Sequence, residues 1–538
     1  MDGLFLYGPP GSGKSTLGKL LARRLARPFV DLDAEIEKAA GRSIPAIFAA
    51  EGEAGFRARE LRALEEVSTR PCAVVALGGG ALVNAAARAV AERCGTVVCL
   101  DCSLDELCAR IARAPGMRPL VAAGAVSAAR TRLEGLLARR AAHYASFPLR
   151  LDVSDRPPEA LLDALEILFG AFRIVSGDVP SDVVVGTDLL ETVGEQAVQR
   201  GLGHRAVVVC DAHTAPRLAP RVVDALERAG VAARLFAIPA GEETKTLATV
   251  QTIWGAFQSA GLGRADFAVA VGGGVVGDMA GFAAATWMRG IPWLNVSTTL
   301  LSMVDASTGG KTGCDLPGAK NMVGAFHSPA LVLADVSTLL TLPVREGRCG
   351  LAEAVKHALI ANPPGLREGL ARFAALRNRP GDATLADFSE DLPALASFVA
   401  HALAVKVDFV RRDPFEKGDR AKLNLGHTVG HAVEKCSGYE ISHGCAVAIG
   451  MAVIARAAAK RGICTADTAA RITDILKAYG LPVETEFTAE ALYGAMLADK
   501  KISGASVRLI VPEGIGRCRI ETVPAAEMRE WLRDGGIA

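Results

Sequence analysis

The stretch GLFLYGPPGSGKSTLGKLLARRL, residues 3–25, combines an apolar run, a glycine-rich loop and a helical repeat. In that order, strand then loop then helix, the pattern GxxxxGK[ST] forms a phosphate-binding loop. Backbone N–H groups and the helix N-terminus would cradle phosphates, Lys14 would reach the terminal phosphate oxygens, and Ser15 would bind magnesium. The stretch therefore predicts a parallel α/β domain with a nucleotide site.

The composition describes a large, nearly neutral chain. Its 538 residues, half of them apolar, suggest about three domains with sizeable cores. A net charge of +1 without runs of like charge argues against nucleic acid or a membrane as a partner. Charged residues interrupt the long apolar runs, and an apolar strand begins at Gly3, so we predict a cytoplasmic protein without signal peptide or membrane span.

Twelve cysteines are spread thinly along the chain, which is not the pattern of a secreted disulfide framework. Cys99 and Cys102 form a lone CxxC, and we interpret both as buried small residues.

Polar residues downstream of the first loop indicate the acceptor of the phosphoryl group. Asp31 and Asp33 are expected at the end of a second strand, on one face. The alternative for Asp31 is a contact in the magnesium shell or a strand-end cap. An acidic residue for hydroxyls, with Arg57, Arg118 and Arg140 for a carboxylate, would suit a small polyhydroxy acid.

Over nearly all of residues 1–170 the chain resembles shikimate kinase, on the phosphate-binding loop (P-loop), DxD, FRxxE, GGG, RPL and RxxxY motifs. The resemblance implies a P-loop fold that binds ATP with Mg²⁺ through Gly11, Gly13, Lys14, Ser15 and Thr16. It also implies that shikimate is bound by Asp33, Arg57, Gly79 and Arg140, with Asp33 orienting the attacking hydroxyl. Arg118 would be the lid arginine that, with Lys14, neutralises charge during phosphoryl transfer, although RAPGMRPLV is short for such a lid. Another small-metabolite kinase, such as gluconate kinase, is the alternative.

A tight join follows the kinase-like segment. Residues 152–180 contain one amphipathic helix, then a new strand pattern near Phe172, with no flexible linker between them. We predict domains over residues 1–171, 172–338 and 339–538.

A second glycine turn lies in DFAVAVGGGVVGDMAGFAAATW, residues 266–287. Gly272, Gly273 and Gly274 would let the backbone approach a pyrophosphate. The turn is not GxGxxG, and a glycine triplet alone is a weak signal.

The segment LNLGHTVGHAVEKCSGYEISHGC, residues 423–445, predicts a metal site. His427 and His431 are four apart and share a helix face, and a break at Gly438 and Tyr439 would let His443 fold back beside them. Neutral imidazoles suit zinc or a similar divalent ion, which also favours a carboxylate ligand.

Glu353 in LAEAVKHALI can supply that carboxylate, with Lys356 three residues later on the same face. Thr428 stands where the HExxH proteases have their glutamate, so this is a different kind of site. A polar helix face with scattered histidines is the alternative.

From about residue 173 onward the chain resembles 3-dehydroquinate synthase. The motifs are GGGVVGD, STTLLSMVDASTGGKT, AKNMVGAFH, TLPVREGRCGLAEAVKH, NLGHTVGHAVE, SHGCAVAIGM and DKK, in family order. The resemblance implies a Rossmann-like NAD-binding α/β domain followed by a mostly α-helical metal-binding domain, with the active site between them. Zn²⁺ or Co²⁺ would be bound by Glu353, His427 and His443. NAD⁺ would be bound by Asp211, Glu242, Lys245, Gly274, Val275, Val276, Gly277, Asp278, Thr298, Thr299, Lys311, Lys320 and Thr341.

The same resemblance implies 3-deoxy-arabino-heptulosonate 7-phosphate as the substrate, with NAD⁺ acting as a catalyst without net redox change. Its carboxylate and phosphate would be gripped by Lys311, Asn321, Lys356, Lys406, Arg420, Asn424 and His431. Asp305 would also bind the substrate. Arg289 would be contributed across the interface of a homodimer. The chain departs from the family at Ala319, Ser297 and Cys445, and in DPFEKGDR (413–420), without losing a proposed ligand.

The sequence thus predicts a bifunctional enzyme of aromatic precursor synthesis. Three alternatives remain for the second part: another sugar-phosphate cyclase, a metal-dependent alcohol or glycerol dehydrogenase, and a non-catalytic scaffold. A dehydrogenase would lack the phosphate-gripping lysines, and a scaffold would have eroded ligand positions.

Overall fold

The computed structural model describes residues 3–113, 126–176, 179–317, 319–497 and 506–538. The chain divides into two compact units, residues 1–173 and 174–538. Arg118 and the DKK motif lie outside the described residues. The predicted division of the second unit at residue 338 stays a prediction.

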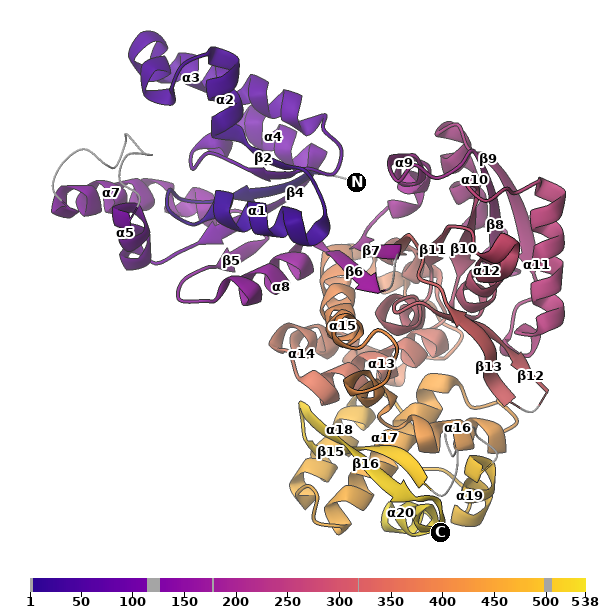
Figure 1. Cartoon of the computed structure of the whole chain (residues 1–538). Helices are drawn as coiled ribbons and strands as arrows, with labels where there is room; N and C mark the ends of the chain where they lie inside the picture. The colour runs from indigo at the N-terminus through magenta and orange to yellow at the C-terminus, as the bar shows by residue number, and fades with distance from the viewer. Residues whose placement is uncertain (1–2, 114–125, 177–178, 318, 498–505) are drawn as a thin grey trace. The chain divides into compact units, whose positions relative to one another are not determined.

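The first unit contains a five-stranded parallel sheet in the order β2-β3-β1-β4-β5 (Figure 1). The strands are β1 (Gly3–Tyr7), β2 (Phe29–Asp31), β3 (Val74–Ala76), β4 (Gly95–Asp101) and β5 (Arg150–Asp152). The helices are α1 (Lys14–Leu25), α2 (Leu32–Ala40), α3 (Ile44–Ser68), α4 (Ala85–Cys94), α5 (Leu104–Arg113), α7 (Val126–Ala145) and α8 (Pro158–Phe169), with a 3₁₀ turn η1 (Ala81–Val83).

Successive side chains of a strand point to opposite faces of the sheet, and helices bury both faces. Leu4 and Leu6 of β1 pack in a core with α1 and α8. Phe5 and Tyr7 pack in a second core with α2, α3 and α4. The apolar run at the start of the chain is therefore the central strand of the unit.

The expected placement of Asp33 on a strand is wrong. Strand β2 ends at Asp31 and helix α2 begins at Leu32, so Asp33 lies in the first helical turn. A carboxylate is favoured there by the positive end of the helix dipole. Asp31 and Asp33 therefore do not share a strand face.

The second unit is built on a seven-stranded sheet in the order β6-β7-β14-β11-β10-β8-β9. Every neighbouring pair from β7 to β9 is parallel. The strands are β6 (Ala171–Ser176), β7 (Val179–Gly186), β8 (Arg205–Asp211), β9 (Ala232–Ile238), β10 (Phe267–Gly272), β11 (Trp293–Ser297) and β14 (Leu331–Asp335).

Helices cover both faces of this sheet. One core joins it to α11 (Leu247–Ala260) and α12 (Gly274–Thr286), and another to α9 (Val193–Gln199) and α10 (Ala219–Arg228) (Figure 1). Between β11 and β14 the chain forms a π-helical turn, η5 (Ser302–Ala306), and an antiparallel hairpin, β12 (Lys311–Leu316) with β13 (Ala319–Phe326). The short connections are η2 (Leu189–Thr192), η3 (Glu242–Thr244), η4 (Trp287–Arg289) and η6 (Val336–Thr341).

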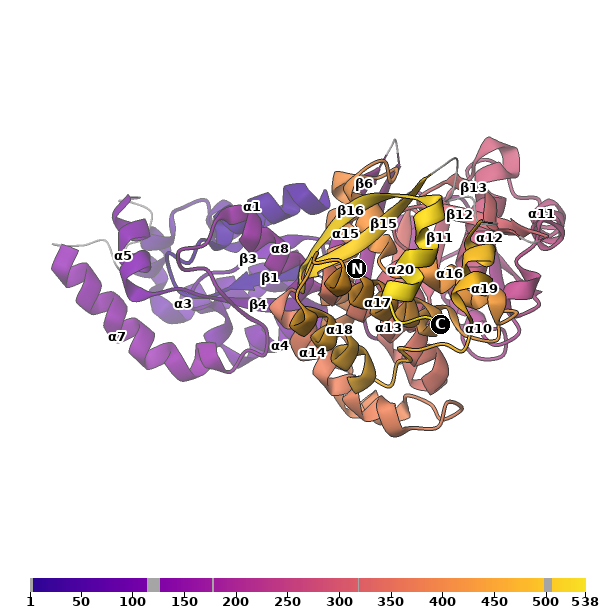
Figure 2. The ribbon, with the colours of Figure 1, turned by 90° about the horizontal axis from the view of Figure 1, so that it is seen from below.

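The remainder is mostly helical, as predicted. Its helices are α13 (Val344–Ala361), α14 (Pro364–Ala371), α15 (Leu392–Arg412), α16 (His427–Cys436), α17 (His443–Lys460), α18 (Ala466–Ala478), α19 (Ala489–Leu497) and α20 (Met528–Asp534). The 3₁₀ turns are η7 (Arg372–Asn378), η8 (Ala386–Asp391), η9 (Asp419–Asn424) and η10 (Ala525–Glu527). A hairpin of β15 (Ser506–Gly514) and β16 (Arg517–Pro524) packs with α20 against α17, in yellow in Figure 2.

Two helical segments, 386–412 and 443–460, are long and apolar enough to cross a bilayer by length and composition. Charged residues do interrupt both segments, as expected, at Lys406 in the first and Arg456 in the second, but the expectation that no run is long and apolar enough to span a bilayer is wrong by this criterion. Within the fold, 61% and 72% of their apolar windows are buried. Core helices of globular proteins pass the same test, so these two segments are weak evidence for a membrane span.

All twelve cysteines are free. Cys99 is buried in β4, as predicted, but Cys102 lies just beyond the strand end and is only partly buried.

Candidate functional site

The first candidate site is the loop between β1 and α1. Gly8, Gly11 and Gly13 all have positive φ, which side chains disfavour, and Gly13 caps the N-terminus of α1. A Cβ on Gly8 would lie 2.4 Å from the backbone oxygen of Leu100. The loop can therefore expose its N–H groups to phosphates only with glycine at these positions.

Lys14 folds back over this loop. Its Nζ donates hydrogen bonds to the carbonyl oxygens of Gly8 and Pro9, at 2.8 and 2.9 Å. Ser15 Oγ donates to Asp31 Oδ2 at 2.6 Å, which places the carboxylate beside the predicted magnesium ligand. This contact favours the magnesium-shell interpretation of Asp31.

Side chains predicted to bind the phosphoryl acceptor gather around the loop Gly78–Gly80. Arg140 Nη1 and Tyr144 Oη donate to the Gly79 carbonyl oxygen, at 2.9 and 2.7 Å. A Cβ on Gly80 would lie 2.8 Å from Arg57 Nη2 and 3.0 Å from Arg140 Nη2, so the two guanidinium groups converge on this glycine.

On the other side of the same loop, a Cβ on Gly78 would lie 2.9 Å from Asp33 Oδ1. Buried Glu60 binds Arg57 at 2.5 Å and fixes its direction. Three charged side chains predicted to bind the acceptor, Asp33, Arg57 and Arg140, are therefore brought together at residues 78–80.

The second candidate site begins where β10 leads into α12. Two of the residues predicted to line the NAD⁺ site, Thr298 and Thr299, contact the Gly272–Gly274 turn. The Thr298 N–H donates to the Gly272 carbonyl oxygen at 3.0 Å. A Cβ on Gly273 would lie 3.0 Å from the Thr299 side chain. The Thr299 side chain thus needs glycine at position 273, which is also the N-cap of α12, and a helix N-terminus after a glycine turn suits a pyrophosphate.

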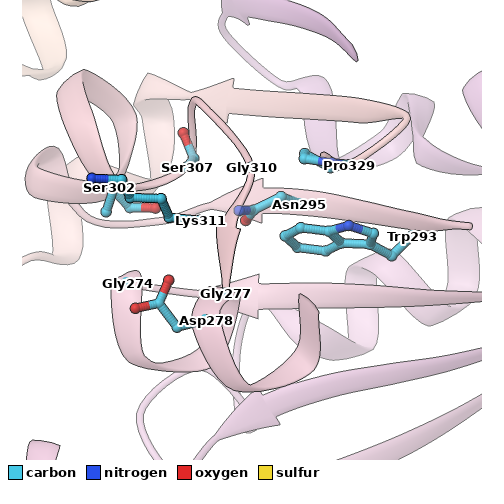
Figure 3. A pocket seen from close by; sticks show the side chains of 11 residues that line it. Gly274, Gly277, Asp278, Trp293, Asn295, Ser302, Ser307, Gly310, Lys311 and Pro329 are labelled. Atoms are coloured by element: carbon cyan, nitrogen blue, oxygen red, sulfur yellow. The ribbon is translucent and has the colours of Figure 1, made fainter. Parts of the chain in front are cut away.

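A small cavity of about 10 Å³ lies behind this turn (Figure 3). Gly274, Gly277 and Asp278 of α12 lie on one side, Trp293 and Asn295 project from β11, and the segment before Lys311 closes another side. Within the described residues, the buried Asn295 Oδ1 has no hydrogen-bond partner. A cavity of this size can hold one water molecule that would satisfy this oxygen.

Lys245 connects the cofactor helix to the β12–β13 hairpin. Its Nζ donates to Asp278 Oδ2 and Asn321 Oδ1, both at 2.6 Å. Burial alone would lower the pKa of Lys245, but the charges of Asp278 and Glu242 raise it above its usual value. Lys245 is therefore a fixed cation between two predicted binding elements.

A metal centre is formed by Glu353 of α13, His427 of α16 and His443 of α17. Glu353 Oε1 lies 3.6 Å from His427 Nε2 and 3.4 Å from His443 Nε2. Tetrahedral ligands at zinc bond lengths of about 2.05 Å stand about 3.3 Å apart. The three ligand atoms therefore fit one ion of that size, which the clustering of these residues also indicates.

The outer nitrogens of both histidines have acceptors. His427 Nδ1 faces the Leu425 carbonyl oxygen at 3.2 Å, and His443 Nδ1 faces Glu434 Oε2 at 3.3 Å. Such partners orient metal-binding imidazoles and select the tautomer that presents Nε2. Burial alone would lower the pKa of His443, but Glu353 and Glu434 raise it to about 9, so the cluster has a strong preference for a cation.

Two lysines flank this centre, Lys356 fully buried and Lys406 partly buried. Lys356 Nζ forms ion pairs with Glu353 and with Asp305 Oδ2, the latter at 3.1 Å, and Lys406 Nζ pairs with Asp305 Oδ1. Burial alone would raise the pKa of Asp305, but the two ammonium groups lower it well below its usual value. The cations predicted to grip the substrate are thus preassembled around one carboxylate.

A second group of residues predicted to bind the substrate surrounds Glu416. Lys311 Nζ forms an ion pair with Glu416, and Asn424 Nδ2 donates to Glu416 Oε1 at 2.7 Å. Buried Arg420 donates to the Gly309 carbonyl oxygen at 3.1 Å and to that of Pro414. A Cβ on Gly309 would lie 2.3 Å from Arg420 Nη2, so the guanidinium needs glycine there.

Three residues predicted to bind NAD⁺ or the substrate have no described contact with the groups above. Arg289 is exposed on η4, at a positive φ of 71°, and no described contact joins it to the other substrate residues. Asp211 Oδ1 accepts hydrogen bonds from the backbone of its own turn, at His213 and Thr214. Thr341 lies at the end of η6. Their roles stay predictions.

Sequence reasoning missed three acidic residues: Glu60, Glu416 and Glu434. Each orients a predicted binding residue rather than standing in a motif as a ligand. For Glu60 a signal was available, because FRxxE places it three residues after Arg57 on one helix face. Glu416 lies in the divergent DPFEKGDR segment, and Glu434 contacts a histidine on the following helix.

Comparison with known proteins agrees with this geometry. The profile described as shikimate kinase matches residues 10–167. The profiles described as 3-dehydroquinate synthase N-terminal and C-terminal match residues 235–349 and 350–502. A 3-dehydroquinate synthase from Geobacter metallireducens is 42% identical over 342 residues, 63% of this chain and 92% of that protein.

The chain belongs to the 3-dehydroquinate synthase family and carries a shikimate kinase ahead of it. It therefore has shikimate kinase and 3-dehydroquinate synthase activities and acts in the shikimate pathway. The predictions of family, fold class and activity are confirmed.

Two solved structures add detail. The 2-epi-5-epi-valiolone synthase from Streptomyces hygroscopicus subsp. jinggangensis, solved with NAD⁺ and Zn²⁺, has a TM-score of 0.60 at 28% identity, covering 67% of this chain and 98% of that one. A shikimate kinase from Acinetobacter baumannii, in complex with shikimate, is 35% identical over 31% of this chain and 92% of that one, with a TM-score of 0.29. The assignment of the shikimate kinase rests on the profile match over residues 10–167.

Proposed function

We propose that the first site binds ATP with Mg²⁺ on the Gly8–Ser15 loop and shikimate at residues 78–80. Asp33 would receive the hydroxyl that attacks ATP, and Arg57 and Arg140 would bind the carboxylate. The convergence of both guanidinium groups on Gly80 supports this assignment. Lys14 would exchange its two backbone acceptors for phosphate oxygens, because it already lies over the loop. Arg118 keeps its proposed role as the lid arginine.

We propose for the second site that Glu353, His427 and His443 bind Zn²⁺ or Co²⁺, and that the Gly272–Gly274 turn binds NAD⁺ with Lys245, Asp278 and their neighbours. When bound, the ion would supply a Lewis acid for a substrate hydroxyl and NAD⁺ would take up and return one hydride. The spacing of the three ligand atoms is the observation that carries this proposal.

The chain's own residues would bind and orient 3-deoxy-arabino-heptulosonate 7-phosphate. Lys356, Lys406 and Lys311 offer ammonium groups, and Arg420, Asn321 and Asn424 offer further donors. These donors are shared between the hairpin and the helical part, so closing the site would exclude water from the trianionic substrate. His431 lies 5.5 Å from His427 and 6.0 Å from His443, between ring centroids, and would support proton transfer to the departing phosphate.

The deciding experiment measures phosphate release from the heptulosonate phosphate with NAD⁺, before and after chelation by EDTA. Release that needs metal and NAD⁺, without net NADH, supports the cyclising reaction. Net NADH without phosphate release would instead assign the second unit to the metal-dependent alcohol dehydrogenases. Phosphate release with a different cyclic product would point to another sugar-phosphate cyclase.

Two further predictions accompany this function. Arg289, exposed on η4, would complete a neighbouring site in a homodimer. A cytoplasmic location would suit both reactions. Sedimentation of the wild type, and mixing of Arg289→Ala with His427→Ala to look for restored activity, would test the shared site.

A further inference from the structure

The loop between α15 and η9, residues 413–418, presents Glu416 to the substrate residues, and its shape is set by Asp413. Asp413 Oδ1 accepts the N–H of Lys417 at 2.9 Å, and Oδ2 accepts those of Gly418 and Arg420 at 2.7 and 3.1 Å. These bonds tie the base of the loop and leave Phe415 and Glu416 at its outer turn. Glu416 has a positive φ of 56°, which an ordinary side chain adopts only when its surroundings impose it.

Phe415 is an exposed apolar side chain with one aromatic neighbour in this region. Its ring meets that of Phe326 edge to face, at 5.4 Å between centroids and 78° between planes. Phe326 is 51% exposed and Phe415 46% exposed, so neither belongs to a hydrophobic core. A pair of phenylalanines with half their surface in water contributes little to general packing, which points to a local purpose.

The register of the hairpin explains that purpose. Lys311 of β12 and Phe326 of β13 are direct ladder partners, so their side chains lie on the same face of the hairpin. Glu416 and Phe415 are neighbours on the loop. Two adjacent hairpin residues therefore contact two adjacent loop residues, one pair by charge and the other by aromatic contact.

We propose that Phe326 and Phe415 form an aromatic clasp that holds strands β12 and β13 against the 413–418 loop and positions Glu416 against Lys311 and Asn424. The clasp acts through Glu416 and Lys311 and does not touch the reacting atoms, so both phenylalanines are positioning residues. It also accounts for the DPFEKGDR departure, because the phenylalanine in that segment is the one that reaches the hairpin. This inference rests on the proposed synthase function.

The test measures phosphate release from the heptulosonate phosphate by the full chain with Zn²⁺ and NAD⁺. Phe326→Ala and Phe415→Ala should each lower kcat/KM by about threefold to tenfold, mainly through a higher KM for the sugar phosphate. The kcat/KM of the double variant should be no lower than that of the less active single variant, because both changes remove the same contact. Phe415→Tyr, which keeps an aromatic edge, should restore most of the loss.

Two controls separate positioning from general stability. Leu235→Ala removes an equally exposed apolar side chain (44%) on β9 and should leave KM unchanged. Phe415→Ala should leave the thermal midpoint, zinc content and kinase turnover as in the wild type. In a Glu416→Gln background, Phe415→Ala should cause no further decrease in kcat/KM for phosphate release.

Any of three results would overturn the clasp: unchanged KM in both single variants, fully additive losses in the double variant, or an undiminished effect in the Glu416→Gln background. A lower thermal midpoint with loss of zinc would also overturn it, because the role would then be structural. Absence of phosphate release from the wild type would instead overturn the proposed function and the clasp together.

Discussion

The phosphate-binding loop of the kinase and the proposed substrate site of the synthase offer different kinds of group to an anion. The phosphate-binding loop of the kinase presents mainly backbone, with glycines at positive φ, a helix N-terminus and one lysine resting on carbonyl oxygens. The synthase site presents side chains from segments between residues 245 and 443, and its cations are paired with carboxylates before any substrate arrives. A backbone site can stay open without uncompensated charge, whereas a buried side-chain site needs its own counter-ions.

Removal of a metal ligand gives the largest expected effect and tests whether the two sites work independently. His427→Ala should reduce phosphate release by at least about 10³-fold, because a substrate hydroxyl would lose its Lewis acid, and should lower zinc content. Kinase turnover of the same preparation should be unchanged. Loss of both activities would contradict the independence of the two units.

The reciprocal change acts on the kinase. Lys14→Ala should reduce shikimate phosphorylation by about 10²- to 10³-fold, since it deletes the only side-chain cation of the loop itself. ATP-dependent phosphorylation and phosphate release from the heptulosonate phosphate can be measured on one sample. Lys14→Arg is the matched control, and a normal rate for Lys14→Ala would remove this lysine from the mechanism.

The counter-ion argument is tested most directly at Asp305. Asp305→Asn keeps the shape but leaves the buried Lys356 and the partly buried Lys406 without their shared carboxylate. The free energy of unfolding of the second unit should fall by about 3 kcal/mol or more. Urea denaturation would measure this change, and an exposed pair such as Arg228 with Glu191 offers a control, where Glu191→Gln should cost under about 1 kcal/mol.

The smallest expected effect is the loss of folding stability at low pH that His357 of α13 causes. Burial, followed by the charge of Lys356, lowers the pKa of His357 from 6.5 to about 4. The unfolded chain therefore binds more protons between these pH values, so the stabilising contribution is complete above pH 6.5 and is lost as pH falls to 4. The loss is at most about 3 kcal/mol.

His357→Asn should flatten that part of the stability curve, because its amide can still donate to the Ala402 carbonyl oxygen that His357 Nδ1 faces at 3.0 Å. Urea midpoints of both proteins between pH 4 and 7 would measure it. Parallel curves would show that another group titrates there.

The contrast between the two sites also decides what can be predicted from sequence. The P-loop is contiguous, so its residues specify both the local fold and the chemistry. The metal cluster is predictable only in part: His427 and His431 share a helix face, which suits a divalent ion, but the choice of His427 and His443 with Glu353 as ligands comes from the resemblance to 3-dehydroquinate synthase. The DxD motif misplaces Asp33 on a strand, because it fits either a strand end or a helix start, and only the helix dipole favours the second.

Glu416 and Glu434 cannot be found in this way. Their importance comes from contacts with Lys311 and His443, which depend on how the hairpin and the helices pack. A carboxylate among 59 acidic residues carries no periodicity that distinguishes it. The residues that orient other residues are therefore the ones that need the structure.

The join between the two catalytic parts consists of little more than one residue. Helix α8 ends at Phe169, Gly170 turns the chain with a φ of 58°, and strand β6 begins at Ala171. Each translated message therefore yields kinase and synthase centres in equal numbers. The cell can change the ratio of the two fluxes only through substrate supply and turnover numbers, never through the relative abundance of the two enzymes.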